Sequence, residues 1–143
     1  MYGFPKIAGE AMFTPGQESK ITSGDVSIII PKDMYTEPLK FELLLGDEKL
    51  WQACVPDNKV VIAPYAYRIT DPSTGKLIGR VDKPVSMSVT DPRIASNAEY
   101  WSTSAANPPT AQLSSAKPQM SGATFKVDNG SARVGWFVTV PRR

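Results

Sequence analysis

The sequence contains no histidine and a single cysteine, Cys54, among its 143 residues. Without histidine the chain lacks the commonest general base, the usual partner of serine and cysteine nucleophiles, and the most frequent transition-metal ligand. One thiol forms neither an internal disulfide nor a thiolate metal cluster. We therefore expect a protein that is not an enzyme, and we interpret Cys54, which lies in an apolar stretch, as a packing residue.

The chain also has little net charge and no long apolar run. Its 16 basic and 14 acidic side chains leave a formal net charge of +2, whereas nucleic-acid-binding proteins typically carry a clustered positive excess. No stretch approaches the roughly 18 consecutive apolar residues that span a bilayer, and the opening MYGFPKIAGE lacks the pattern of a signal peptide. We expect no nucleic-acid partner and no membrane insertion.

Proline and glycine are plentiful, with 13 and 10 residues, and they separate short runs in which apolar residues alternate. The clearest example is GDVSIIIPKDMYTEPLKFELLL, from Gly24 to Leu45. A period of two with β-branched and aromatic residues is typical of strands that bury one face. Turn chemistry follows at Asp71–Gly75 and at Asp128–Ser131, where Asn-Gly is a strong hairpin signal. The composition and these patterns predict an all-β protein.

The predicted organisation is a single domain with an irregular extension. Residues 1–17 read as an irregular N-terminal arm with a short edge strand at 6–8, and residues 18–143 as one mainly antiparallel β-sandwich. A long irregular connection is expected at about 93–117. Besides the strands near 26–30 and 39–45, we expect strands at 49–55, 59–63, 65–70, 76–80, 83–90, 99–103, 111–115, 123–127 and 133–140, and no helix.

The predicted core consists of the inward-facing members of these alternating runs. They are Val26, Ile28, Ile30, Phe41, Leu43, Tyr67, Ile69, Val85, Met87, Val89, Phe125, Val134, Trp136 and Val138.

Three stretches together resemble ZU5-type β-sandwich modules of bacterial cell-surface proteins. They are SGDVSIIIP with the leucine-rich strand after it, the Asp71–Gly75 hairpin leading into KPVSMSVT, and Tyr100-Trp101 followed by ATFKV and VGWFVTV. The resemblance implies an immunoglobulin-like or ZU5-like sandwich with a non-catalytic, often extracellular role. Some members of that family cleave themselves at a His-Phe-Ser step. This chain has Thr124-Phe125-Lys126 there, so self-cleavage is not implied.

The candidate binding residues are Tyr100 and Trp101, which we expect to be exposed because they lie in the polar connection. With Trp51, Trp136 and the tyrosines they could form a platform on which sugar rings stack, although large aromatics on alternating strands also suit a sandwich core.

Carboxylates at strand ends are the other candidates, namely Asp71, Asp82, Asp91 and the pair Asp47-Glu48. Aspartate in a turn is explained by hydrogen bonds to its own backbone, so we expect no cofactor and no metal site. Calcium is the ion that such oxygen ligands would suit. Asn129-Gly130-Ser131 matches an N-glycosylation pattern, which the turn explains equally well.

Three functions remain open. The first is an interaction or spacer module of a larger extracellular or cell-surface protein, with a protein or glycan partner and a leader outside this sequence. The second is a structural subunit of a self-assembling particle such as a phage tail or decoration protein, hence located in a virion. The third is a carbohydrate-binding module. The oligomeric state separates the first two, because an assembly subunit forms closed symmetric oligomers.

Overall fold

The computed structural model describes residues 4–79, 83–95, 97–104, 110–114, 119–129 and 135–142. The strands are β1 (Lys6–Phe13), β2 (Ser19–Ser23), β3 (Val26–Ile30), β4 (Leu39–Leu45), β5 (Lys59–Thr70), β6 (Val85–Thr90), β7 (Glu99–Ser104), β8 (Thr110–Leu113), β9 (Gln119–Ser121), β10 (Thr124–Asn129) and β11 (Gly135–Pro141). The helix α1 is Glu48–Gln52.

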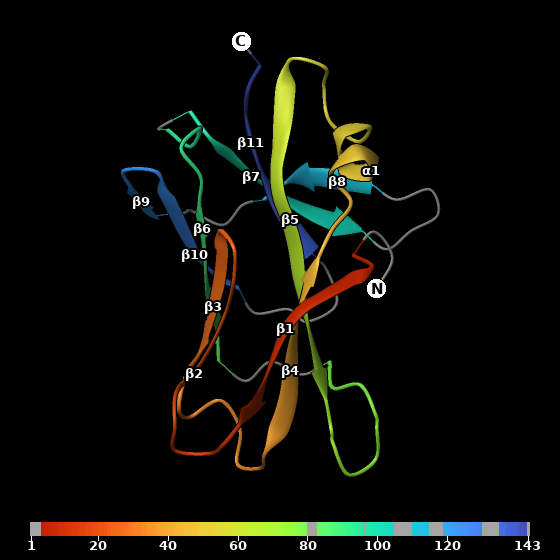
Figure 1. Ribbon diagram of the computed structural model, residues 1–143, viewed down its shortest axis with the longest axis vertical. Coiled ribbons are helices and arrows are strands. Elements are labelled where there is room, and N and C mark those ends of the chain that lie inside the picture. The colour runs from red at the N-terminus through yellow and green to blue at the C-terminus, as the bar shows by residue number, and fades with distance from the viewer. Residues whose placement is uncertain are drawn as a thin grey trace.

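These strands form two antiparallel sheets that face each other (Figure 1). The six-stranded sheet has the order β1-β4-β5-β11-β7-β8, and the five-stranded sheet has the order β2-β3-β6-β10-β9. The chain passes from one sheet to the other six times, after β1, β3, β5, β6, β8 and β10. The predicted all-β, mainly antiparallel sandwich is confirmed.

Alternating apolar residues of both sheets meet between them and form the main core. Along β3, for example, Val26, Ile28 and Ile30 are buried while Ser27 and Ile29 stay partly exposed. Every described member of the predicted core belongs to this cluster, and Val134 lies outside the described residues. Apolar residues at every second position were enough to predict this core, because these strands turn one face inward.

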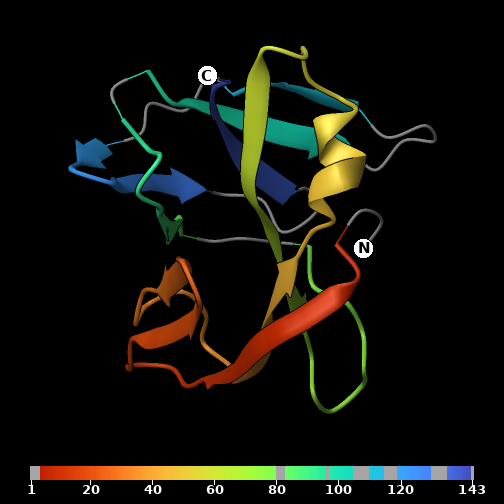
Figure 2. The same ribbon diagram turned by 45° about the horizontal axis from the view of Figure 1, so that its top comes forward.

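The six-stranded sheet carries a second apolar cluster on its outer face. This outer cluster comprises Phe4, Leu44, Trp51, Val55, Val61, Ala66, Trp101 and Phe137, with Leu50, Cys54 and Ala111 packed against it. β11 is therefore buried on both faces from Gly135 to Val140. Helix α1 and the segment before β1 cover the outer face, and Figure 2 shows them beside each other over this sheet.

The strand predicted at 49–55 is wrong, because these residues begin with helix α1. Asp47 is its N-cap: the side-chain oxygen accepts hydrogen bonds from the backbone N–H groups of Lys49 (3.0 Å) and Leu50 (3.4 Å). Such a cap satisfies donors that a first helical turn leaves free. The apolar residues also fit a helical spacing of four, since Trp51 and Val55 belong to the outer cluster and Leu50 and Cys54 pack against it.

Helix α1 stands where a strand neighbour of β5 is missing. β4 pairs with β5 only at Tyr65–Thr70, so the edge of β5 is free nearer its start. The Gln52 amide fills this place, because it donates to the carbonyl of Lys59 (2.6 Å) and accepts from the N–H of Val61 (3.0 Å). One side chain thus copies the two hydrogen bonds that a neighbouring strand would make.

Residues 1–17 are not an irregular arm throughout. The short edge strand predicted at 6–8 exists but extends to Phe13, and β1 pairs with β4 over its whole length apart from a bulge between Ile7 and Gly9. The bulge shifts the alternation, so Ile7 and Met12 both lie opposite outward-facing residues of β4. A strand whose alternation is broken in this way has no clean period of two, which explains why the pattern predicted it poorly.

The two strands predicted on either side of Pro64 are one strand, β5. A register shift opposite Trp136 and Val138 places Pro64 where no ladder hydrogen bond is required of it. Ala63 just before it has a φ of +50°, a left-handed conformation that is unusual for a residue with a side chain.

The strand predicted at 76–80 is reduced to one bridge between Thr70 and Leu77, and Arg80 lies outside the described residues. Leu77 is 64% exposed, so it has no core to face. In the long connection the predicted strands at 99–103 and 111–115 correspond to β7 and β8.

Four tyrosines lie in the main core, and their hydroxyl groups differ in hydrogen bonding. The hydroxyls of Tyr65 and Tyr100 are bonded at 2.7 Å. The hydroxyl of Tyr67 is buried and finds no partner in the part of the chain that the structure describes. Burial, and next the neighbouring Tyr100, raises the pKa of Tyr65 well above its ordinary value, and burial raises that of Tyr67, so both stay protonated.

Replacing Tyr67 by Phe should leave the free energy of unfolding unchanged or raise it by about 1–3 kcal/mol, because an unpaired buried hydroxyl is removed. Tyr65→Phe is the matched variant and should lower stability by about 1 kcal/mol through loss of the bond to Tyr100. Urea unfolding at pH 7 measures both. A clear loss of stability in Tyr67→Phe would show that its hydroxyl is hydrogen-bonded.

Gln52→Ala should lower the free energy of unfolding by about 1–3 kcal/mol, because a carbonyl and an N–H of β5 lose their partner. The free energy of unfolding of Gln52→Glu should lie between those of the wild type and Gln52→Ala, because a carboxylate accepts from the N–H of Val61 but cannot donate to the carbonyl of Lys59. Lys49→Ala, at an exposed position of the same helix, is the control and should change stability by less than about 0.5 kcal/mol. Equal stability of Gln52→Ala and Lys49→Ala would refute the edge-capping role.

Candidate functional site

Tyr100 and Trp101 are buried, so the expected exposure is wrong for both. They are 3% and 8% exposed. The ring of Tyr100 stacks on Phe125 at 5.2 Å in the main core, and Trp101 stacks on Phe137 at 5.9 Å in the outer cluster. The Trp101 indole Nε1 donates to Thr139 Oγ1 at 2.9 Å. Neighbours in the sequence thus serve the two faces of one sheet, which is the packing role of an alternating strand.

The other aromatic residues are buried as well. Every phenylalanine, tyrosine and tryptophan that the structure describes lies in the main core or the outer cluster. A flat platform of exposed rings is what stacking against sugars needs. The described surface offers none, so the aromatic basis for carbohydrate binding is lost.

The turn carboxylates serve their own backbone, as expected. Asp47 caps α1, and Asp71 accepts hydrogen bonds from the N–H (2.9 Å) and hydroxyl (2.7 Å) of Ser73. These bonds lower the pKa of Asp71. Asp82 and the pair Gly130-Ser131 lie outside the described residues. Within the described ranges, no three acidic or cysteine side chains gather closely enough to hold a metal ion.

Asp91 differs from the other turn carboxylates because it fixes an arginine. It ends β6, is 6% exposed, and accepts from Nε and Nη2 of Arg93, both at 2.9 Å. The Arg93 side chain stays 53% exposed. The hydrogen bonds from Arg93 lower the pKa of Asp91, and the same contact raises the pKa of Arg93, with smaller effects of Glu48 and Asp25. A buried carboxylate thus holds an accessible guanidinium in one orientation.

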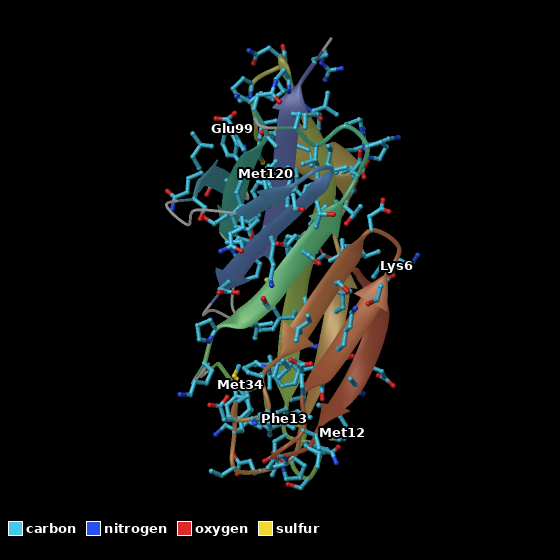
Figure 3. All side chains as sticks on the ribbon, turned by 90° about the vertical axis from the view of Figure 1, so that its left-hand side faces the viewer. Lys6, Met12, Phe13, Met34, Glu99 and Met120 are labelled. Atoms are coloured by element: carbon cyan, nitrogen blue, oxygen red, sulfur yellow. The ribbon has the colours of Figure 1, made fainter. Side chains whose placement is uncertain are left out.

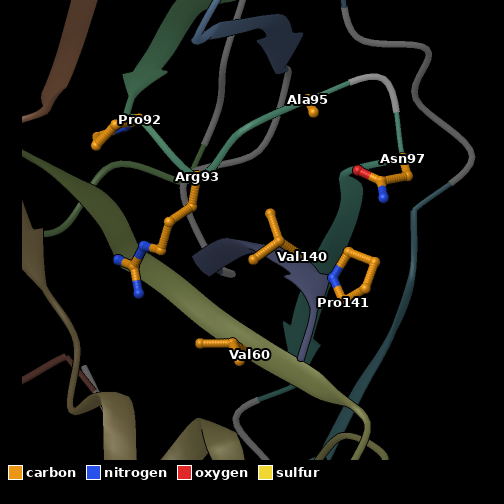
Figure 4. A pocket seen from close by; sticks show the side chains of 7 residues that line it. All are labelled: Val60, Pro92, Arg93, Ala95, Asn97, Val140 and Pro141. Carbon is orange, nitrogen blue, oxygen red and sulfur yellow. The ribbon is translucent and has the colours of Figure 1, made fainter. Parts of the chain in front are cut away.

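A hollow of about 640 Å³ lies beside this pair at one end of the sandwich. Figure 4 shows Val60 of β5 with Val140 and Pro141 of β11, and across from them Pro92, Arg93 and Ala95, with Asn97 near Pro141. Of the described residues that line the hollow, Arg93 is the one that carries a charge. The walls of the hollow are apolar, and the guanidinium of Arg93 and the amide of Asn97 lie at its edge.

Two further hollows adjoin Arg93. One of about 480 Å³ lies between α1 and β5, where Lys49, Gln52 and Asp57 line it together with Val60 and Arg93. The smallest reaches the Ser23–Val26 turn and Ala63. We call the first two hollows, which share Val60 and Arg93, the Arg93 groove.

Asp91, beside the Arg93 groove, is held as a carboxylate by its hydrogen bonds from Arg93. The guanidinium keeps Nη1 and one Nη2 hydrogen for a ligand, since Asp91 takes only one edge of the fork. Mixed charges beside aliphatic walls match a polypeptide better than a polyanion.

Sequence reasoning missed Arg93. Asp-Pro occurs twice, at Asp71-Pro72 and Asp91-Pro92, and both were interpreted as turns. Both aspartates do bond to the residue two positions ahead. The residue two positions ahead is arginine after Asp91 and serine after Asp71, and this difference was the signal available in the sequence. The burial of Asp91, which fixes that arginine, depends on the tertiary fold.

At pH 7 the free energy of unfolding of Asp91→Asn should be about 1–3 kcal/mol lower than that of the wild type, because the charge-assisted hydrogen bonds from Arg93 are weakened. Its folded pKa lies below the ordinary value of 3.8, so this contribution is present above about pH 4 and is lost as the pH falls through the folded value. Urea unfolding from pH 7 to 2.5 should show the two proteins converging. The exposed Asp33→Asn is the control, and a constant gap would contradict the assignment.

The helix α1 is too short to cross a membrane, and the described chain has no other helix. A comparison with models of known protein families finds no match, and no curated protein is significantly similar to this chain.

Proposed function

We propose that this chain is a non-catalytic interaction module of a larger extracellular or cell-surface protein, and that it binds an extended segment of a partner protein in the Arg93 groove. The observation that carries the proposal is the buried Asp91 that fixes an exposed Arg93 between two adjoining hollows. Arginine held over aliphatic surface is typical of residues that dominate protein interfaces.

The shape and charge of the groove support a polypeptide as its ligand. Val60, Val140 and Pro141 offer apolar surface for a side chain. The opposite stretch, along α1, offers the charged Lys49 and Glu48. A ligand with alternating apolar and polar groups satisfies both stretches.

Lack of histidine supports a non-catalytic role. The resemblance of residues 20–140 to ZU5-type modules supports the cell-surface setting, which stays a prediction.

A phage-displayed library of random peptides selected on the immobilised protein tests the proposal. Selection should yield peptides with a shared pattern, and Arg93→Ala should weaken their binding by about 10- to 100-fold, as expected for an interface arginine. Biolayer interferometry with the synthetic peptides measures the change.

Arg68→Ala is the matched control. Arg68 also pairs with a buried carboxylate, Glu42, at 2.9 Å, and it lies on the solvent face of the six-stranded sheet away from the groove. The control should bind the selected peptides like the wild type. Peptides that Arg93→Ala and wild type bind equally, or selection without any shared pattern, would refute the groove as the binding site.

A further inference from the structure

β1 lies at an edge of the six-stranded sheet, so β4 is its one sheet neighbour. With 8 residues it is the longest of the four edge strands, since β2 has 5, β8 has 4 and β9 has 3. It therefore presents the longest row of backbone groups on one pairing surface of the six-stranded sheet.

Phe4, two residues before β1, fits a socket on the outer face of the sheet. The ring is 2% exposed and stacks on Trp51 of α1 at 5.4 Å. Two glycines make room for it. A Cβ added at Gly135 would lie 2.1 Å from Phe4 Cζ, and one at Gly46 would lie 2.9 Å from the ring. The socket is therefore shaped for an aromatic side chain that arrives with β1.

Phenylalanines anchor both ends of this segment, and two apolar side chains between them are exposed. Phe13 is fully buried in the main core, like Phe4 in the outer cluster. Between them Ile7 is 53% and Met12 is 49% exposed. Figure 3 shows Met12 and Phe13 at one end of the strand and Lys6 at the other.

The connection from Thr14 to Glu18 leads β1 back toward β2 and is exposed throughout. Gly16 has a φ of +84°. Two backbone hydrogen bonds hold the connection, from Gly16 N to Lys32 O (2.9 Å) and from Gln17 N to Thr14 O (3.0 Å). Opening this turn would give up few contacts, and an extended connection would carry β1 away from its own β4.

We propose that the segment Phe4–Phe13 exchanges between two copies of this chain, each copy placing its Phe4 in the socket of the other and its β1 along the other's β4. Every contact of the segment is re-formed in the exchanged dimer, because socket and edge are identical in both copies. The equilibrium between monomer and exchanged dimer therefore depends only on the protein concentration and on how readily the connection opens.

A second copy is the occupant that the structure favours. The socket and the β4 edge must be filled together by an aromatic residue followed by a strand with a bulge, and this chain supplies that combination.

Cysteine trapping distinguishes exchange from the closed chain. Met12 lies directly opposite Lys40 in the β1–β4 pair, a separation that a disulfide can bridge. One chain carries Met12→Cys, a second carries Lys40→Cys, and both carry Cys54→Ala. After the two are mixed at high concentration in mild urea and the urea is removed, oxidation should give a covalent heterodimer on a non-reducing gel.

Leu113→Cys in place of Met12→Cys is the matched control, because Leu113 is a similarly exposed residue (55%) on the edge strand at the other end of the sheet. The Met12 mixture should yield several times more heterodimer than the Leu113 mixture. Equal yields would overturn the proposal.

Deletion of Pro15 to Gln17 is the second test, since a connection too short to turn back should shift the protein from monomer to dimer in light scattering. A shortened chain that stays folded and monomeric would also overturn the proposal. Neither result bears on peptide binding in the Arg93 groove.

Discussion

The six-stranded sheet is apolar on both faces, and much of the remaining structure is arranged to keep its second face from water. A sandwich normally needs only its inner faces to be apolar, with the outer faces solvated. Here Leu44, Val61 and Phe137 point outward from three adjacent strands. The segment before β1, helix α1 and the indole of Trp101 cover them. Removing this cover would expose a continuous apolar surface on β4, β5 and β11.

Covering that face with a short helix decides where the Arg93 groove lies. Because β4 leaves the sheet at Leu45, the chain turns into α1 beside the free edge of β5, and Gln52 closes that edge. The space between α1 and the segment after β6 remains open and meets Arg93. A continuous strand in place of α1 would have completed the sheet and filled the groove.

The sequence predicted the main core well and the outer cluster poorly, for one physical reason. Residues such as Met87 and Val89 alternate with serine or threonine, so a single buried face leaves a clear period of two. In β4 and β11 both faces are buried, and Leu43-Leu44 and Trp136-Phe137 carry no such contrast. Tyr100 and Trp101 were predicted to be exposed because their polar neighbours describe the connection and not the sheet they enter. Arg93 was missed because the burial of its partner Asp91 arises only in the folded chain.

Close neighbouring atoms, and not the backbone conformation, require glycine at positions 46 and 135. Neither has a positive φ, unlike Gly16, Gly24, Gly75 and Gly122, which open onto solvent. At Gly135 the space is taken by the ring of Phe4, whereas at Gly46 it is taken by Pro64 as well as by Phe4. A larger residue at position 135 is therefore compatible with this packing only in a chain whose fourth residue is small, whereas at position 46 the proline at 64 would have to change too.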